Sequence, residues 1–362
     1  MIGVALVGLP GVRLAADAQQ AVASFDQLTQ GYNMISFGNA SFGGNYGDTQ
    51  GALAVNGNLT MQGTGQIAEH AGAGAGKPSL YVTGELNLDP GQYTRLKNGY
   101  AYLPNATGTW NSSTQELTKS NGGVYSAINS SDPLSSTDPR STQGSAPWDW
   151  AALNSSLVGV SNALAAAATT GTIGVSGQNM TFNTNGQTTG VAVFTLDGND
   201  FSGTIFDADG DNVFDQNNEN ISNFAVNVPA DMVYVINVIN FGGKTLLGGI
   251  NANNGGESNE RLLWNIVPSN GNTGTVTLGK DGSYLNGSVL APLVDIKNGQ
   301  GTAPVGQIVA GSYTHNGGEL HYADFSSPVA FSPVPEPGTW GMFGVAGCAV
   351  MMICRRPRRG SR

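Results

Sequence analysis

The sequence predicts a mainly β protein: a glycine-rich, right-handed β-solenoid with one long flanking α-helix, followed by a C-terminal transmembrane helix. Glycine supplies 53 of the 362 residues, about twice the usual share, and the glycines punctuate short β-branched runs without a collagen period. One glycine-led phrase recurs at a spacing near twenty residues, and one segment has the apolar spacing of a long helix.

Short runs rich in valine, isoleucine, leucine and threonine are the predicted strands. They are Gly51–Val55, Leu80–Thr83, Val191–Leu196, Phe224–Val228, Val233–Ile239, Leu262–Val267, Thr275–Leu278, Ser288–Ala291 and Gln307–Ala310. Gly287–Ala291 and Gly306–Ala310 are near repeats 19 residues apart, and Gly51–Val55 is a similar phrase upstream. This period predicts coils that bury their inner faces by stacking, with the two near repeats as neighbouring parallel strands. A β-sandwich also uses short strands at regular spacing and is the alternative.

One amphipathic helix is predicted between the strands. Its apolar positions recur at intervals of three and four, at Trp150, Leu153, Leu157, Val160 and Leu164. Pro147 falls near its start and Gly171 is placed to end it. We expect this helix to pack along a sheet face, and we expect residues 106–145, rich in Ser, Thr, Asn and Gly, to form a long surface excursion with one hairpin.

The C-terminal segment has the order of a membrane-targeting signal. Pro335-Glu336-Pro337 precedes an uncharged apolar run and a basic tail over 355–362 with five arginines. Gly338–Cys354 is 17 residues long, the lower limit for a membrane-spanning helix, and the arginines place its end in the cytoplasm. A plain C-terminal anchor is the alternative interpretation.

This tail resembles the PEP-CTERM sorting signal. The resemblance implies that an exosortase, a membrane-embedded cysteine transpeptidase, cuts the chain near Pro335, Glu336 and Pro337. It also implies an exported protein that is anchored transiently in the inner membrane and then reaches the cell surface or the extracellular (biofilm) matrix.

These features divide the chain into five segments. They are a partial signal peptide or N-terminal segment (1–24), a β domain (25–326), a Pro-rich linker with the tripeptide (327–338), a transmembrane helix (339–354) and a basic cytoplasmic tail (355–362). The N-terminal segment is apolar but has no basic start. Both cysteines, Cys348 and Cys354, lie in the C-terminal apolar segment, so the β domain must bury a core without disulfides.

The body of the chain resembles the choice-of-anchor A domain. The matching segments, in order, are 32–39, 48–59, 263–265, 287–292 and 317–321 with Phe325, and the resemblance spans about residues 25–326. Members of that family are bacterial surface proteins with various C-terminal anchors, and the resemblance implies no catalytic activity. The layout of strands, helix and glycine phrases is also similar to ice-binding β-solenoids, although Thr273, Thr275 and Thr277 alternate only once and no threonine ladder recurs from coil to coil.

The amino-acid composition narrows the range of functions that the protein could have. Only 11% of residues are charged, and without the five terminal arginines a net charge of −10 becomes −15, which argues against nucleic-acid partners. No Gly-x-Ser-x-Gly nucleophile motif occurs. We therefore expect a non-enzymatic structural or adhesive surface protein, with exopolysaccharide or other surface glycans as partners. The alternatives are a solenoid-type carbohydrate-active enzyme, which needs a cleft of converging Asp, Lys and Arg, and an ice- or glycan-binding module, which needs a flat Thr/Asn face.

One acidic loop is a candidate calcium site, and no other cofactor is expected. Asp207, Asp209, Asp211 and Asp215 alternate and then skip four residues, as in loops that give one calcium ion several oxygen ligands. Asn212 replaces the glycine that an EF-hand loop has at its sixth position. A solvated acidic turn is the other interpretation.

Overall fold

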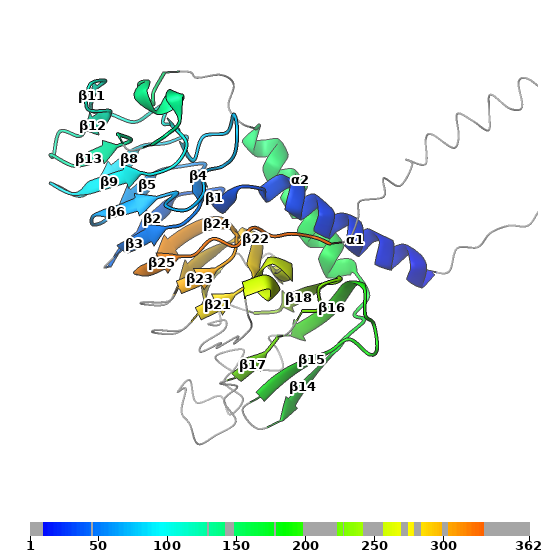
Figure 1. Cartoon of the computed structure of the whole chain (residues 1–362). Helices are drawn as coiled ribbons and strands as arrows, with labels where there is room; N and C mark the ends of the chain where they lie inside the picture. Colours follow the sequence, from blue (N-terminus) through cyan, green and yellow to red (C-terminus); the bar gives the residue numbers. More distant parts are fainter. Residues whose placement is uncertain are drawn as a thin grey trace, which may run out of the picture. The chain divides into compact units, whose positions relative to one another are not determined.

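The computed structural model describes residues 10–44, 46–128, 130–141, 148–176, 179–197, 223–226, 228–241, 256–268, 274–278, 284–298 and 303–328. Within these ranges the protein is mainly β, with two α-helices, α1 (Pro10–Thr29) and α2 (Trp150–Ala166), and two short 3₁₀ turns, Pro133–Ser136 and Gly256–Arg261 (Figure 1). No helix in the described ranges is long and apolar enough to cross a membrane, and the predicted span over 339–354 lies outside them.

The first sheet is a stack of parallel strands. Its order is β10 (Ala101–Tyr102), β7 (Leu80–Val82), β4 (Ala52–Val55), β1 (Tyr32–Ser36), β24 (Ile308–His315), β22 (Ser288–Asn298), β19 (Leu262–Ile266), β18 (Met232–Ile239) and β16 (Gly190–Asp197). Every neighbouring pair in this order is parallel. Antiparallel pairing, which a β-sandwich would show, is absent from this path of described strands.

The chain enters this stack in its middle. From β1 it proceeds through β4 and β7 to β10 at one end, and after α2 it resumes with β16 at the other end. The later strands then return to the middle, where β24 pairs with β1 through Met34↔Ile308 and Ile35↔Val309 (Figure 1). The first strand of the domain, β1, and the late strand β24 are therefore neighbours in the middle of the stack.

The same coils build two further faces. The second sheet, which is continuous with the first through β24 and β22, contains β8 (Leu86–Leu88), β5 (Leu59–Met61), β2 (Ala40–Phe42), the second halves of β24 and β22, and β20 (Thr275–Leu278), all parallel. The third face is made by β13 (Val124–Ser126), β9 (Tyr93–Leu96), β6 (Gly65–Ile67), β3 (Tyr46–Thr49), β25 (Gly318–Leu320), β23 (Ala303–Val305) and β21 (Tyr284–Asn286). Apolar side chains from the faces meet in one buried core.

The near repeats behave as predicted. In the pair β22–β24, Val289 lies opposite Ile308 and Ala291 opposite Ala310, which is the 19-residue offset of the sequence. Both strands run past the predicted ends, because each turns a corner and continues in the second sheet. The excursion over 106–145 contains the predicted hairpin, β11 (Thr109–Asn111) with β12 (Glu116–Thr118), and β12 also pairs with β13. A small separate sheet holds β14 (Thr172–Ser176), β15 (Asn179–Asn183) and β17 (Asn223–Ala225).

Helix α2 forms where its apolar spacing predicts and packs on the first sheet. Asp149 caps it, accepting hydrogen bonds from the backbone N–H of Ala151 at 2.8 Å and of Ala152 at 3.1 Å. The prediction that Gly171 ends the helix is wrong, because α2 stops at Ala166. Gly171 is small for another reason: a Cβ there would lie 2.1 Å from the Phe194 ring.

Two buried asparagines fix the position of α2 on the sheet. Asn265 donates to the carbonyl oxygen of Ser161 at 2.9 Å and accepts from its hydroxyl at 2.7 Å. Asn237, on the neighbouring strand, accepts from Asn265 at 2.8 Å and donates to the carbonyl of Leu164 at 2.8 Å. Buried amides with their hydrogen bonds satisfied specify one register of helix on sheet.

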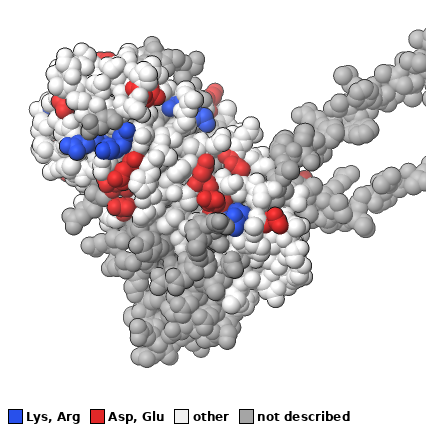
Figure 2. Space-filling model, in the orientation of Figure 1, with Lys and Arg blue, Asp and Glu red and all other residues white. Residues whose placement is uncertain are grey.

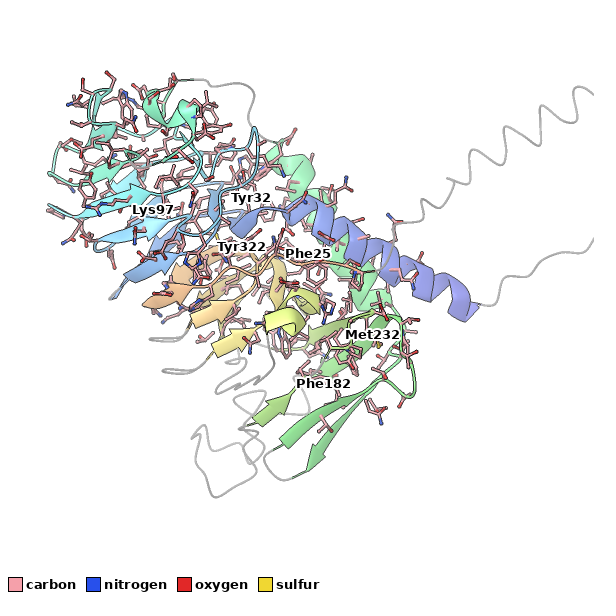
Figure 3. The ribbon with its side chains drawn as sticks, in the orientation of Figure 1. Phe25, Tyr32, Lys97, Phe182, Met232 and Tyr322 are labelled. Carbon is pink, nitrogen blue, oxygen red and sulfur yellow. The ribbon has the colours of Figure 1, made fainter. Side chains whose placement is uncertain are left out.

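Helix α1 spans the predicted boundary between the N-terminal segment and the β domain. Ala18, Ala21, Val22 and Phe25 are buried in the apolar layer between the helices and the first sheet. Residue 24, the end of the predicted N-terminal segment, falls inside this helix. Phe25 of α1 and Tyr32 of β1 are labelled in Figure 3.

Candidate functional site

A row of outward polar side chains crosses the second sheet from strand to strand. In register, the row is Asn87, Thr60, Ser41, Thr314, Lys297 and Thr277. Each projects outward between buried neighbours, because residues alternate between the two sides of a strand. We call this outer side of the second sheet the polar face.

The polar face has a regular spacing and a second row. Neighbouring strands lie about 4.8 Å apart, so the row repeats hydrogen-bonding groups at that interval. In the second row, Thr275 lies opposite Asp295 and Asp295 opposite Ser312, whose hydroxyl donates to the Asp295 carboxylate at 2.6 Å. The two rows together carry hydroxyl and amide groups with one cation, Lys297, and one anion, Asp295.

Asparagine side chains from neighbouring coils are stacked at the corner beside the polar face, where the chain turns from one sheet to the next. The Asn39 side-chain oxygen accepts from the backbone N–H of Asn58 at 2.8 Å, and the Asn58 oxygen accepts in the same way from Glu85 at 2.8 Å. These bonds replace backbone pairing where the chain turns between sheets. They keep the coils in one register, and the outward row depends on that register.

A partly buried ion pair between Lys119 and Glu85 lies at the β8 end of this corner. The Lys119 ammonium donates to the Glu85 carboxylate and to the Thr107 carbonyl oxygen at 2.8 Å. Burial raises the pKa of Glu85, but hydrogen bonds from Lys119 and Thr107 outweigh it, so this pKa is lowered overall. A small polar hollow of about 250 Å³ lies beside Lys119, lined also by Thr109, Thr118 and Ser120.

The inner side of the polar face is apolar and contains His315. The His315 ring lies 5.1 Å from the Phe42 ring, and its two nitrogens contact the Tyr313 hydroxyl at 3.1 Å and the Gly318 carbonyl oxygen at 3.0 Å. Burial lowers the pKa of His315 from its ordinary 6.5 to about 4, and the bond to Gly318 only partly opposes this. His315 is therefore a neutral core residue at neutral pH.

His315 should make the free energy of unfolding depend on pH. The unfolded chain takes up a proton near pH 6.5 and the folded chain only near pH 4. Stability is therefore complete above about pH 6.5 and falls towards pH 4, by on the order of 3 kcal/mol. Urea titrations across this range should show the fall, and His315→Gln should remove it. The same change at the exposed His70 is the control, and an unchanged profile in His315→Gln would contradict the assignment.

All of the predicted site residues lie outside the described residues. Neither the acidic loop with Asp207, Asp209, Asp211 and Asp215 nor the tripeptide Pro335–Pro337 is described, so both stay predictions. Within the described residues, no group of three or more His, Cys, Asp or Glu side chains could hold a metal ion.

The sequence did not predict the polar face, because the residues that form it are far apart along the chain. The sequence showed Thr275 and Thr277 but no recurring threonine ladder. The structure joins them to serine, asparagine and lysine from other coils, so the row is mixed in residue type and distant in sequence. Charge is sparse on the side of the molecule in Figure 2, where acidic and basic residues stand in a few groups among uncharged ones.

One comparison with known proteins identifies the fold family. A family model described as "Putative Ice-binding-like adhesive domain" matches residues 25–322, from the last turn of α1 to just past β25. No curated protein matches the chain. The match fits an adhesive or structural role at a surface or extracellular location. Because the model covers most of the sequence, the chain belongs to the family of ice-binding-like adhesive domains.

Proposed function

We propose that this protein is an exported, non-enzymatic surface adhesive that binds extended surface glycans or exopolysaccharide through the polar face. The row from Asn87 to Thr277 carries the proposal, because it repeats hydroxyl and amide groups along one direction. A polysaccharide presents hydroxyl groups in the same linear, repeated way. The sugar hydroxyls then exchange hydrogen bonds with the row, each contributing on the order of 1 kcal/mol.

Ice is the second candidate ligand, favoured by the even strand spacing and by the family. The row contains Lys297, and the second row contains Asp295. Both charged groups hold water strongly, and neither matches an uncharged ice lattice. A glycan tolerates such groups and can hydrogen-bond to them. The composition of the polar face therefore favours glycan over ice.

Removing two hydroxyls from the polar face should weaken polysaccharide binding. In Thr60→Val/Thr314→Val the side-chain shape is kept and two hydrogen-bonding groups are lost, so affinity should fall by about tenfold or more. Binding is measured on immobilised dextran, xanthan and alginate with the full chain. Thr118→Val, on β12 and outside the polar face, is the matched control. If the double variant bound polysaccharide as well as the wild type, the proposal would be contradicted. If the wild type inhibited ice recrystallisation and the double variant did not, the polar face would be assigned to ice binding.

Export through the C-terminal signal is part of the same proposal. Its support is the order of tripeptide, apolar run and arginine tail in the sequence. The exosortase is the processing partner, and the apolar run would hold the protein in the inner membrane until cleavage. The Asp207–Asp215 loop is kept as a candidate calcium site of the exported domain, to be tested by calcium titration calorimetry.

Processing should remove the C-terminal end of the chain. We expect the mature protein from envelope or matrix material to lack residues 338–362, because cleavage occurs near the tripeptide. Intact-mass measurement gives the new terminus. Pro335→Ala/Pro337→Ala should leave the full mass, and Pro333→Ala, two residues upstream, is the control. A mature form that still carries Arg355–Arg362 would contradict the sorting assignment and favour a plain anchor.

A further inference from the structure

Aromatic rings gather where α2 begins beside the first sheet. They come from β1 and the residue after it, from β7, from β10 and from the entry to α2: Tyr32, Phe37, Tyr81, Tyr102, Trp148 and Trp150. We call this group the aromatic cluster. Strands and helix hold the rings in place, so a ligand meets a preformed surface.

Three of the rings form a stack. Tyr81 stacks on Trp150 with centroids 5.4 Å apart and planes at 27°, and it stacks on Tyr102 at 5.4 Å and 22°. Trp148 lies edge-on to Trp150 at 5.5 Å. Tyr102 belongs to β10, the last strand of the first sheet at this end. One face of the Tyr102 ring is therefore used by the stack, and the other is turned away from Tyr81.

The cluster has a buried floor and a partly exposed rim. Tyr32 and Tyr81 are buried, whereas Tyr102, Trp148 and Trp150 keep part of their surface in solvent. Burial raises the pKa of Tyr81. The rim is the part of the cluster that a ligand can reach.

Three buried polar atoms beside the rim have no partner among the residues that the structure describes. They are Nε1 of Trp148, Nε1 of Trp150 and the side-chain oxygen Oδ1 of Asn154, one turn of α2 beyond Trp150. Buried polar atoms in folded proteins normally have a hydrogen-bond partner, and each one left without costs free energy. Packing of α2 on the sheet explains the rings but leaves these two donors and this acceptor unexplained.

We infer that the aromatic cluster is a binding subsite for a neutral pyranose sugar. Such a ring has an apolar C–H face, which stacks on the side of the Tyr102 ring turned away from Tyr81, and hydroxyls around its edge that both donate and accept hydrogen bonds. These hydroxyls match the Trp148 donor and the Asn154 acceptor. Asp149, between the two tryptophans in sequence, is exposed and acidic, so neutral sugars bind in preference to uronates.

This subsite is separate from the polar face, and its test is separate too. The polar face needs a long polymer, because its row spans several coils. The aromatic cluster spans a few rings and takes a short oligosaccharide. Loss of polymer binding in Thr60→Val/Thr314→Val with intact oligosaccharide binding would identify two independent sites.

The experiment titrates the full chain with cellohexaose, maltohexaose, laminarihexaose and chitohexaose, following tryptophan emission and calorimetric heat. At least one should give a saturable emission change, and trigalacturonate should bind more weakly. Tyr102→Leu and Trp148→Leu should each weaken binding by about tenfold, whereas Tyr102→Phe, which keeps the ring, should stay within about twofold. Trp110→Leu, a partly buried tryptophan on β11 outside the cluster, is the matched control.

Circular dichroism and melting temperature confirm that each variant is folded, and Trp148→Leu keeps the test decisive if Tyr102→Leu unfolds. No emission change or heat with any hexasaccharide would overturn the inference. Unaltered affinity in folded Tyr102→Leu and Trp148→Leu would overturn it as well.

Discussion

Replacing Gly306 by alanine is expected to destabilise the domain by about 3 kcal/mol or more, because the change adds backbone strain and a steric clash. Gly306 opens the second of the near-repeated phrases and has a φ of 142°, which residues with a side chain rarely adopt. A Cβ at this position would lie 2.5 Å from the Gly287 carbonyl oxygen and 2.6 Å from the Gly287 carbonyl carbon. The neighbouring coil would have to move, and urea titration measures the loss.

Gly159→Ala is the matched control and should have the opposite sign. Gly159 lies inside α2, and a Cβ there meets nothing within 4 Å. Alanine favours the helix over glycine, so this change should stabilise the protein by about 0.5–1 kcal/mol. If Gly306→Ala were as stable as the wild type, the close approach of Gly306 to Gly287 would not be the reason why the repeated phrase begins with glycine.

Gln307→Leu should have an effect of similar size, for a polar reason. Gln307 is 1% exposed and joins the first and last coils. Its amide nitrogen donates to the carbonyl oxygens of Thr29 at 2.9 Å and Tyr32 at 3.0 Å and to the Asp324 carboxylate at 3.0 Å. Its oxygen accepts from the Thr29 hydroxyl at 3.0 Å and from the Phe325 N–H at 3.2 Å.

Leucine has nearly the same size but removes a buried hydrogen-bond partner from the Thr29 and Tyr32 carbonyl oxygens and from the Phe325 N–H. Each unpaired group costs about 1–3 kcal/mol, so we expect a loss of about 3 kcal/mol or more in the free energy of unfolding. The matched control is Gln62→Leu, since Gln62 is exposed, and it should change stability by about 0.5 kcal/mol at most. A small effect at Gln307 would mean that the apolar contact between Phe25 and Phe325, at 5.1 Å, is enough to hold the two ends of the domain.

Local sequence patterns were reliable where side-chain periodicity decides the outcome. The strand predicted at Leu262–Val267 forms as β19, and Thr275–Leu278 forms as β20. Helix α2 follows its apolar spacing. The end of that helix was predicted incorrectly, because Gly171 is small to admit the Phe194 ring and not to end a helix. A contact with a distant strand cannot be read from neighbouring residues.

The sequence by itself determined that the chain is mainly β, where nine of the 25 described strands and α2 lie, and that Gly287–Ala291 and Gly306–Ala310 are parallel neighbours. Each of these follows from short-range periodicity or from near-identical phrases. Only the tertiary structure decided that β1 lies beside β24, that Thr60 and Thr314 share the polar face, and that Tyr102 stacks on Tyr81 beside Trp150. These neighbours are brought together by burial of the whole core and by buried amides such as Gln307, which bonds to Thr29 across 278 residues of sequence.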